Sequence, residues 1–232
     1  MTQVWQGEFI EVDVLFSKAG IATQILLTDR MNKNLLLMDC GDGTVRDLMD
    51  RNISFLDLKG VLISHGHPDH MGGLFSLLAA LRLFRYKGDF TVYAPSRCPE
   101  VYSIIQFFLK LYQKGMSFTL HYHELKDQVF ESLGEFIIKP FNVLHYESTK
   151  TSNKVKKSAF GYRVTLRGEV IVFSGDSLQC SELEQEVEGV DLALLEATYD
   201  DSFTEEIPNH LHHKYADYLG RSAKNYFLIH RF

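Results

Sequence analysis

Short apolar runs recur along the whole chain, and they constrain its fold more than any other feature of the sequence. They are three to five residues long and rich in Val, Ile, Leu and aromatic side chains, which is typical of strands buried within a sheet. The runs are Ile25–Leu27, Leu35–Met38, Val61–Ile63, Thr91–Tyr93, Phe136–Ile138, Tyr162–Leu166, Val170–Phe173, Leu192–Leu195 and Tyr226–Ile229. The sequence therefore predicts a protein built around β-sheet.

Helical patterns lie between some of these runs. Apolar residues recur at about 3.6-residue spacing over 74–81 and 104–112, and 212–224 reads as a third helix. Strands that alternate with helices predict an α/β or layered α+β fold. A chain of 232 residues with no internal repeat suits a single domain spanning 1–232, in which the polar stretch 147–158 is expected to be a surface loop.

Polar residues that can carry chemistry follow the apolar runs directly. If the runs are strands, these side chains gather along one edge of the sheets, where short loops on rigid strands hold ligands well. The residues concerned are Asp39, Ser64, His65, His145, Asp176, Glu196 and His230.

Composition excludes several classes of protein. Hydrophobic residues make up 45% of the chain and charged residues 23%, so intrinsic disorder is not expected. No apolar stretch approaches the roughly 18 residues of a membrane helix, and no secretory leader is visible, so a cytoplasmic protein is expected. The net charge of −6 argues against coating nucleic acid through bulk charge, although a nucleic-acid substrate stays open. Three widely spaced cysteines predict buried free thiols rather than disulfides.

The strongest functional signal is the segment Ser64-His65-Gly66-His67-Pro68-Asp69-His70-Met71-Gly72-Gly73-Leu74. Four possible ligands lie within six positions between a strand and a helix, and imidazole with carboxylate suits zinc, iron or manganese. His65 and His67 are two residues apart, so in an extended turn they point the same way and can chelate one ion. Asp69 and His70 open the following helix and can face a second ion.

At this point the sequence resembles the metallo-β-lactamase superfamily, whose hallmark is His-x-His-x-Asp-His. The resemblance implies an αββα sandwich with a two-metal site at the edge of its two sheets. It also implies that Asp39, in Asp39-Cys40-Gly41-Asp42-Gly43, supports the metal-binding loop from behind. The implied ligands are His65, His67 and His145 for one ion, Asp69, His70 and His230 for the other, and Asp176 shared by both.

Two further segments are similar to the ribonuclease Z-like phosphodiesterases. Leu195-Glu196-Ala197-Thr198 matches their Glu-Ala-Thr loop, and His210-Leu211-His212-His213 matches the start of a histidine-containing helix. By that resemblance His210, paired with Glu196, faces the scissile phosphate, although His212 and His213 stay open as alternatives. Only 30 residues separate His145 from Asp176, so the tRNA-binding arm of the family is missing, which argues against tRNA 3′-end processing.

The expected activity is therefore that of a dinuclear metal-dependent hydrolase, a phosphodiesterase that uses a metal-bridging hydroxide. Its substrate would be RNA, a cyclic nucleotide or a small phosphodiester. It would bind two zinc ions, with manganese or iron as alternatives. We also expect the protein to form a homodimer. Asp69 would orient the nucleophile, and His210 with Glu196 would act on the leaving oxygen. The alternatives are hydrolysis of a lactone, thioester or carboxyl ester, or a non-catalytic metal-binding scaffold. Lysines at 150, 154, 156 and 157 are candidates for phosphate contact, although exposed lysines are usually just solvated.

Overall fold

The computed structural model describes residues 3–148, 154–202 and 209–232. The chain divides into two compact units, Met1–Leu125 and Lys126–Phe232, which we call the N-terminal and C-terminal units. Each is described by itself below. The expectation of one domain over 1–232 stays a prediction.

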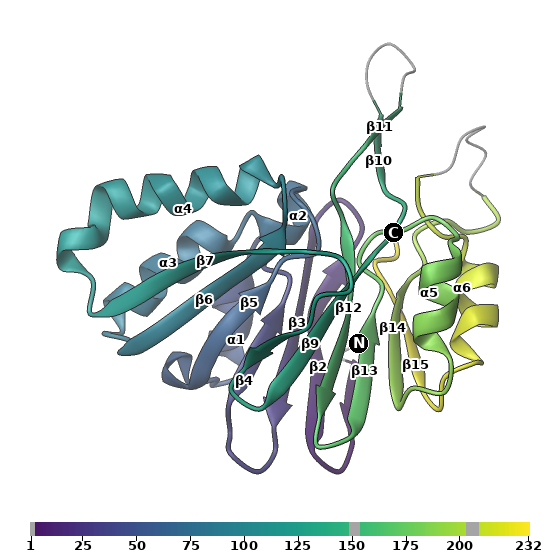
Figure 1. Cartoon of the computed structure of the whole chain (residues 1–232), viewed down its shortest axis with the longest axis horizontal. Helices are drawn as coiled ribbons and strands as arrows, with labels where there is room; N and C mark the ends of the chain where they lie inside the picture. Colours follow the sequence, from purple (N-terminus) through teal and green to yellow (C-terminus); the bar gives the residue numbers. More distant parts are fainter. Residues whose placement is uncertain (1–2, 149–153, 203–208) are drawn as a thin grey trace. The chain divides into compact units, whose positions relative to one another are not determined.

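A seven-stranded sheet forms the centre of the N-terminal unit (Figure 1). Its first four strands pair antiparallel and its last four pair parallel. All side chains of β4 are buried, as expected for a central strand covered on both faces. The strands, in spatial order, are β1 (Gln3–Gln6), β2 (Ile10–Lys18), β3 (Ala22–Asp29), β4 (Leu35–Met38), β5 (Leu58–Leu62), β6 (Gly88–Pro95) and β7 (Phe118–Leu125).

Helices of the N-terminal unit pack their apolar sides into one core with this sheet. In α3 (Leu74–Leu83) the buried leucines fall at helical spacing, and in α4 (Pro99–Tyr112) Val101, Ile105 and Phe108 do the same. The two helices expected over 74–81 and 104–112 are therefore confirmed. The remaining helices are α1 (Thr44–Asp50) and α2 (Pro68–Met71), with the 3-10 turns η1 (Phe55–Asp57) and η2 (Gln113–Gly115).

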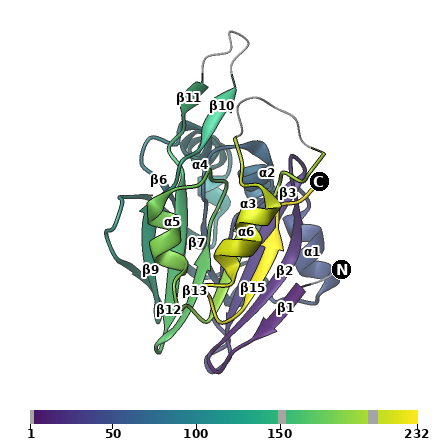
Figure 2. The ribbon, with the colours of Figure 1, turned by 90° about the vertical axis from the view of Figure 1, so that its right-hand side faces the viewer.

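The C-terminal unit contains a six-stranded sheet in the order β15-β14-β13-β12-β9-β8. β13, β14 and β15 run parallel, whereas β8, β9, β12 and β13 pair antiparallel. Helices α5 (Ser181–Val187) and α6 (His213–Gly220) cover one face of this sheet (Figure 2) and share a core with it. The strands are β8 (Glu131–Leu133), β9 (Phe136–Asn142), β12 (Phe160–Leu166), β13 (Glu169–Phe173), β14 (Leu192–Glu196) and β15 (Tyr226–Ile229).

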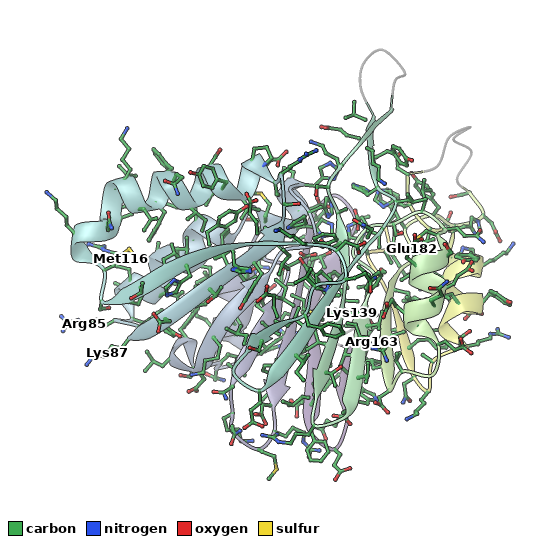
Figure 3. All side chains as sticks on the ribbon, viewed as in Figure 1. Arg85, Lys87, Met116, Lys139, Arg163 and Glu182 are labelled. Carbon is green, nitrogen blue, oxygen red and sulfur yellow. The ribbon has the colours of Figure 1, made fainter. Side chains whose placement is uncertain are left out.

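Two cations face each other across neighbouring strands of that sheet. Lys139 on β9 lies directly opposite Arg163 on β12 (Figure 3), a like-charge pair that would destabilise the strand pairing. Glu186 of α5 lies 2.5 Å from the Lys139 ammonium and 3.5 Å from the Arg163 guanidinium. This shared carboxylate offsets the repulsion and ties α5 to the sheet.

The structure confirms all nine predicted strand runs and the layered α/β class. Sequence reasoning missed β2 and β7 because their apolar residues alternate with polar ones, which is the pattern of a half-buried strand rather than of a continuous run. The third helix is shorter than the predicted 212–224. It ends at Gly220, and the N–H groups of Ser222 and Ala223 bond to the carbonyls of Leu219 and Gly220 in a turn before β15.

The stretch 147–158 is not simply a loop. Its described residues form an antiparallel hairpin of β10 (Tyr146–Ser148) and β11 (Lys154–Lys156). Residue 150 and the side chain of residue 154 lie outside the description, and Lys157 pairs with Glu147 at 2.8 Å. In the described part of the chain, no helix is long and apolar enough to cross a bilayer.

Candidate metal centre

Two parallel strands of the N-terminal unit deliver the first group of site residues to one sheet edge. Asp39 directly follows β4, and the segment His65–His70 follows β5, its parallel neighbour. The ring centroid of His65 lies 4.6 Å from that of His67 and 4.2 Å from that of His70. The predicted histidines of this segment therefore form one cluster in space.

Asp39 supports this cluster through hydrogen bonds to Ser64 and His70. Its carboxylate is fully buried and accepts hydrogen bonds from the Ser64 amide (2.7 Å), the Ser64 hydroxyl (2.8 Å) and His70 Nδ1 (2.6 Å). Burial raises the pKa of the Asp39 carboxyl, while the His70 and Ser64 contacts act in the opposite direction. Its backbone has a φ of 56°, an uncommon conformation that Asp tolerates better than most residues.

The same network sets the tautomers of two histidines. A carboxylate only accepts, so His70 must carry its proton on Nδ1. The Ser64 hydroxyl proton goes to Asp39, so the Ser64 oxygen accepts from His65 Nδ1 at 3.1 Å. The unprotonated nitrogen of both rings is then Nε2, which is the nitrogen that can bind a metal ion.

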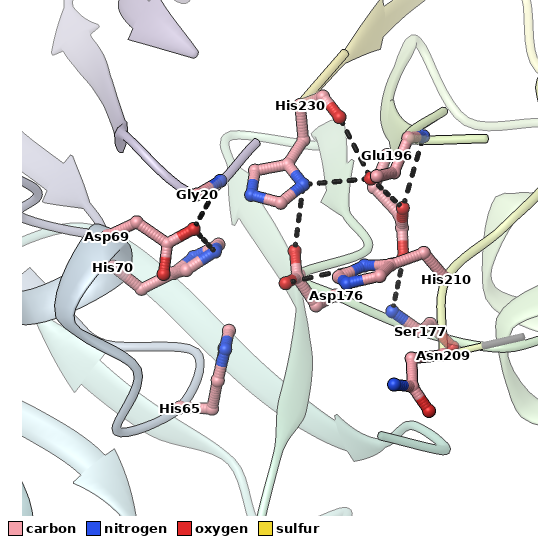
Figure 4. A network of polar contacts seen from close by, with 12 residues as sticks. Gly20, His65, Asp69, His70, Asp176, Ser177, Glu196, Asn209, His210 and His230 are labelled. Carbon is pink, nitrogen blue, oxygen red and sulfur yellow. Dashed lines mark hydrogen bonds and ion pairs between the residues drawn. The ribbon is translucent and has the colours of Figure 1, made fainter. Parts of the chain in front are cut away.

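Glycines bring the metal-binding segment against its neighbours. A Cβ on Gly73 would lie 2.1 Å from the Gly41 carbonyl oxygen, and a Cβ on Gly41 would lie 2.4 Å from the Asp69 carbonyl oxygen. Only glycine permits such backbone contact. The Asp69 carboxylate in turn accepts a hydrogen bond from the Gly20 amide at 3.0 Å, which fixes it to the turn between β2 and β3 (Figure 4).

Three parallel strands deliver the second group, in the C-terminal unit. Asp176, Glu196 and His230 come at or just after the carboxyl ends of β13, β14 and β15, and such ends meet at one edge of a parallel sheet. His145 follows β9 and is 1% exposed. His230 adopts a φ of 53°, a strained conformation of the kind that accumulates at functional sites.

Asp176 lies between two histidines. One of its oxygens is 3.4 Å from His230 Nδ1, and the other is 3.5 Å from His210 Nδ1. The ligand atoms of these three residues lie within 4.8 Å of one another, and the His145 ring centroid is 5.6 Å from that of His210. The C-terminal unit therefore brings together His145, Asp176, His210 and His230.

Glu196 accepts hydrogen bonds from several residues in or next to this second group. Its side chain is 1% exposed. One oxygen accepts from the Ser177 amide at 2.8 Å and from His210 Nδ1 at 3.2 Å (Figure 4), and the other accepts from the Thr198 hydroxyl at 2.7 Å. The expected pairing of His210 with Glu196 is thus present in the structure.

His212 and His213, the alternatives to His210, are placed differently. His212 is the N-cap of α6, where its Nδ1 accepts from the Lys214 amide, and His213 contacts the Tyr199 carbonyl oxygen. Neither ring contacts Glu196, so the geometry favours His210.

Sequence reasoning gave no role to Ser177, placed Ser64 only among the polar residues at the sheet edge, and named Thr198 only as part of the Glu-Ala-Thr loop. Each lies within two residues of a predicted site residue, and for Ser177 this closeness was the signal in the sequence that could have found it. The donor set of each unit consists of imidazole and carboxylate groups, which suits zinc, iron or manganese, and the tautomers of His65 and His70 suit such an ion as well. The residues present therefore fit a divalent metal.

The chain matches a known family over most of its length. The family model for the β-lactamase superfamily domain matches residues 34–223. A ribonuclease Z of Prochlorococcus marinus (strain AS9601) is 34% identical over 142 residues, which cover 59% of this chain and 41% of that relative. A ribonuclease Z of Ignicoccus hospitalis is 28% identical over 227 residues, which cover 81% of this chain and 74% of that relative. The chain thus spans less than half of the first relative's length and about three quarters of the second's.

Solved structures share the fold. The metallo-β-lactamase fold protein YhfI of Bacillus subtilis superposes with a TM-score of 0.76 at 19% identity, covering 96% of this chain and 86% of that one. The short form of human tRNase Z superposes with a TM-score of 0.73 at 22% identity, covering 95% and 92%. The family model confirms the expected superfamily, the solved structures confirm the expected fold, and the relatives in sequence are similar to this chain as members of the expected ribonuclease Z-like branch would be.

Proposed function

The chain belongs to the β-lactamase superfamily. On that basis we propose that it is a dinuclear metal-dependent hydrolase that cleaves a phosphodiester in RNA, a cyclic nucleotide or a small diester. The observation that carries this proposal is the buried Asp39–Ser64 network, which leaves Nε2 of His65 and His70 unprotonated. A histidine loop held in this way suits metal binding. The ribonuclease Z relatives favour the phosphodiester over other substrates.

The proposed ligands divide into two sets. His65, His67 and His145 would hold one ion, Asp69, His70 and His230 the other, and Asp176 would be shared. Zinc is the first choice, with manganese and iron as alternatives for the same donors. When bound, two such metal ions activate water near neutral pH and neutralise charge on the phosphoryl oxygens.

The chain's own residues would move the remaining proton. His210 Nδ1 lies 3.2 Å from one Glu196 oxygen and 3.5 Å from one Asp176 oxygen, and both carboxylates stabilise the protonated ring. His210 would therefore give a proton to the leaving oxygen from Nε2, with Glu196 fixing the orientation of the ring. Asp69, held by the Gly20 amide, would orient the attacking water.

The test is hydrolysis of bis(p-nitrophenyl) phosphate by the full chain with added zinc or manganese. We expect cleavage by the wild type and none by His67→Ala. His121→Ala is the matched control, because His121 is exposed on β7 and its ring contacts Asp89, which is still more exposed. Steady cleavage of a lactone or thioester without phosphodiesterase activity would contradict the substrate class. A metal-loaded chain inert toward every ester would favour the scaffold reading.

The proposed assembly is a homodimer, and the proposed location is the cytoplasm. Light scattering on the purified full chain tests the assembly, with twice the chain mass of 26.7 kDa expected. A mass of one chain at micromolar concentration would contradict it.

A further inference from the structure

A threonine hydroxyl in the C-terminal unit connects two of the site residues. Thr198 is 4% exposed and follows β14 by two residues. Its Oγ1 lies 2.7 Å from Glu196 Oε2, 2.9 Å from His230 Nδ1 and 2.9 Å from the His230 carbonyl oxygen. One oxygen thus faces three polar atoms but carries a single proton.

The position of that proton follows from the chemistry of the three neighbours. A carboxylate and a carbonyl oxygen can only accept, so the hydroxyl proton must point to one of them. Glu196 is the better acceptor because it is charged and 0.2 Å closer than the carbonyl. If the hydroxyl donated to His230 instead, its lone pairs would face two oxygen acceptors inside a buried site.

His230 Nδ1 is therefore the donor to Thr198. A second acceptor agrees with this, because an Asp176 oxygen lies 3.4 Å from the same nitrogen. The proton on Nδ1 leaves the lone pair of the neutral ring on Nε2. His70 reaches the same state through direct contact with the Asp39 carboxylate, whereas His230 reaches a carboxylate through an intervening hydroxyl.

We propose that Thr198 is a positioning residue that relays the negative charge of Glu196 to His230, holding His230 in the Nδ1–H tautomer and its Nε2 ready for a metal ion. This inference rests on the proposed function, and it gives Glu196 a wider task than orienting His210. Through one carboxylate the chain would hold His210 directly, Asp176 through the amide of Ser177, and His230 through Thr198. The Glu-Ala-Thr segment would thus act as one support for three site residues.

The discriminating variants are Thr198→Val, which keeps the shape but removes the hydroxyl, and Thr198→Ser, which restores it. Loss of such an outer partner typically weakens metal binding by about 10- to 100-fold. We expect Thr198→Val to lose that much zinc affinity in a chelator competition, and Thr198→Ser to stay within about threefold of the wild type. Thr165→Val is the matched control, since Thr165 lies on β12 with Ile137 as its cross-strand partner and far along the sheet from these contacts.

A second readout needs neither metal nor activity. The ring nitrogens of His230 in the metal-free full chain report its tautomer by ¹⁵N nuclear magnetic resonance. We expect the Nδ1–H form in the wild type and Thr198→Ser, and a shift toward the Nε2–H form in Thr198→Val. A purely structural hydroxyl would lower stability without moving the tautomer.

The outcomes separate this inference from the proposed function. Metal binding and tautomer that are both unchanged in Thr198→Val would overturn the relay while leaving the hydrolase intact. A chain that binds no zinc would overturn the hydrolase, and the metal-free spectrum would still decide the role of Thr198. If Thr198→Val does not fold, an Nε2–H form of His230 in the wild type overturns the inference, and an Nδ1–H form in both wild type and Thr198→Ser supports it.

Discussion

Replacing Asp39 by Asn tests the support of the histidine cluster most directly. Asn has the same shape and also tolerates the φ of 56° found at this position. What changes is one oxygen, which becomes an amide NH₂ group. The buried carboxylate accepts three hydrogen bonds, two from Ser64 and one from His70, so in either orientation of the Asn amide a donor faces a donor.

The expected loss can be worked from these contacts. A hydrogen bond to a charged group contributes about 1.5–3 kcal/mol, and a buried donor left unsatisfied costs about 1–3 kcal/mol. Part of this is recovered if His70 changes its tautomer and accepts from the new NH₂ group. We therefore expect Asp39→Asn to lower the free energy of unfolding by about 2–3 kcal/mol, a large share of a typical 5–15 kcal/mol.

Two measurements check this prediction. Urea unfolding of the metal-free chain should show a lower midpoint at an unchanged slope, and chelator competition should show about 10- to 100-fold weaker zinc binding. Asp89→Asn is the control, because Asp89 is 73% exposed and its contact with His121 is at the surface, and its effect should stay within about 0.5 kcal/mol. If Asp39→Asn behaves like this control in both assays, the reasoning about the buried network is refuted.

Three further predictions follow from other parts of the structure. Burial raises the pKa of the Cys40 thiol to about 12, so the native chain should leave Cys40 unmodified by a thiol reagent near pH 8 and expose it only in denaturant; rapid labelling of native Cys40 would contradict this. Gly161→Ala should lower the free energy of unfolding by about 1–3 kcal/mol, because its Cβ would lie 2.3 Å from Phe141 Cζ; urea midpoints equal to wild type would show that the ring moves freely. Burial acts to raise the pKa of Asp191, but the hydrogen bonds from Lys224 and the backbone outweigh it and hold this pKa below its usual value. The difference in free energy of unfolding between wild type and Asp191→Asn should therefore have its full size above about pH 4, and it should shrink as the pH falls through the folded-state pKa. A difference that grows toward low pH would contradict the lowered pKa.

Much of the architecture was predictable because its signals are local. The continuous runs Leu35–Met38 and Tyr226–Ile229 coincide with β4 and β15. β4 is buried throughout, and such a strand needs no alternation of apolar and polar residues. β15 is a half-buried edge strand, but its four consecutive apolar residues gave the same local signal. β2 and β7 were not predicted because many of their side chains face away from the core. Their strand signal is an alternation of apolar and polar residues rather than a continuous apolar run. The hairpin β10–β11 was not predicted because most of its residues are polar, and it is their pairing with each other that makes them strands.

The candidate site also has parts that the sequence predicts and a part that it does not. The identities of His65, His67, Asp69 and His70 were readable, because four donors in six positions is a strong signal in any chain. The emergence of Asp176, Glu196 and His230 at one sheet edge followed from the order of parallel strands. That the ligands of the two units close into one cage stays a prediction.

The sequence by itself determined where the strands lie and which side chains can bind a metal, because hydrophobic spacing and donor chemistry are properties of neighbouring residues. Only the tertiary structure decided which nitrogen of each imidazole holds the proton. For His70 that choice depends on the hydrogen bond that its ring donates to Asp39, 31 residues away along the chain. For His230 the proposed choice depends on the hydrogen bond that its ring donates to Thr198, 32 residues away. No local pattern encodes such a partner, since a hydroxyl or carboxylate acquires its direction only when the backbone that carries it is folded.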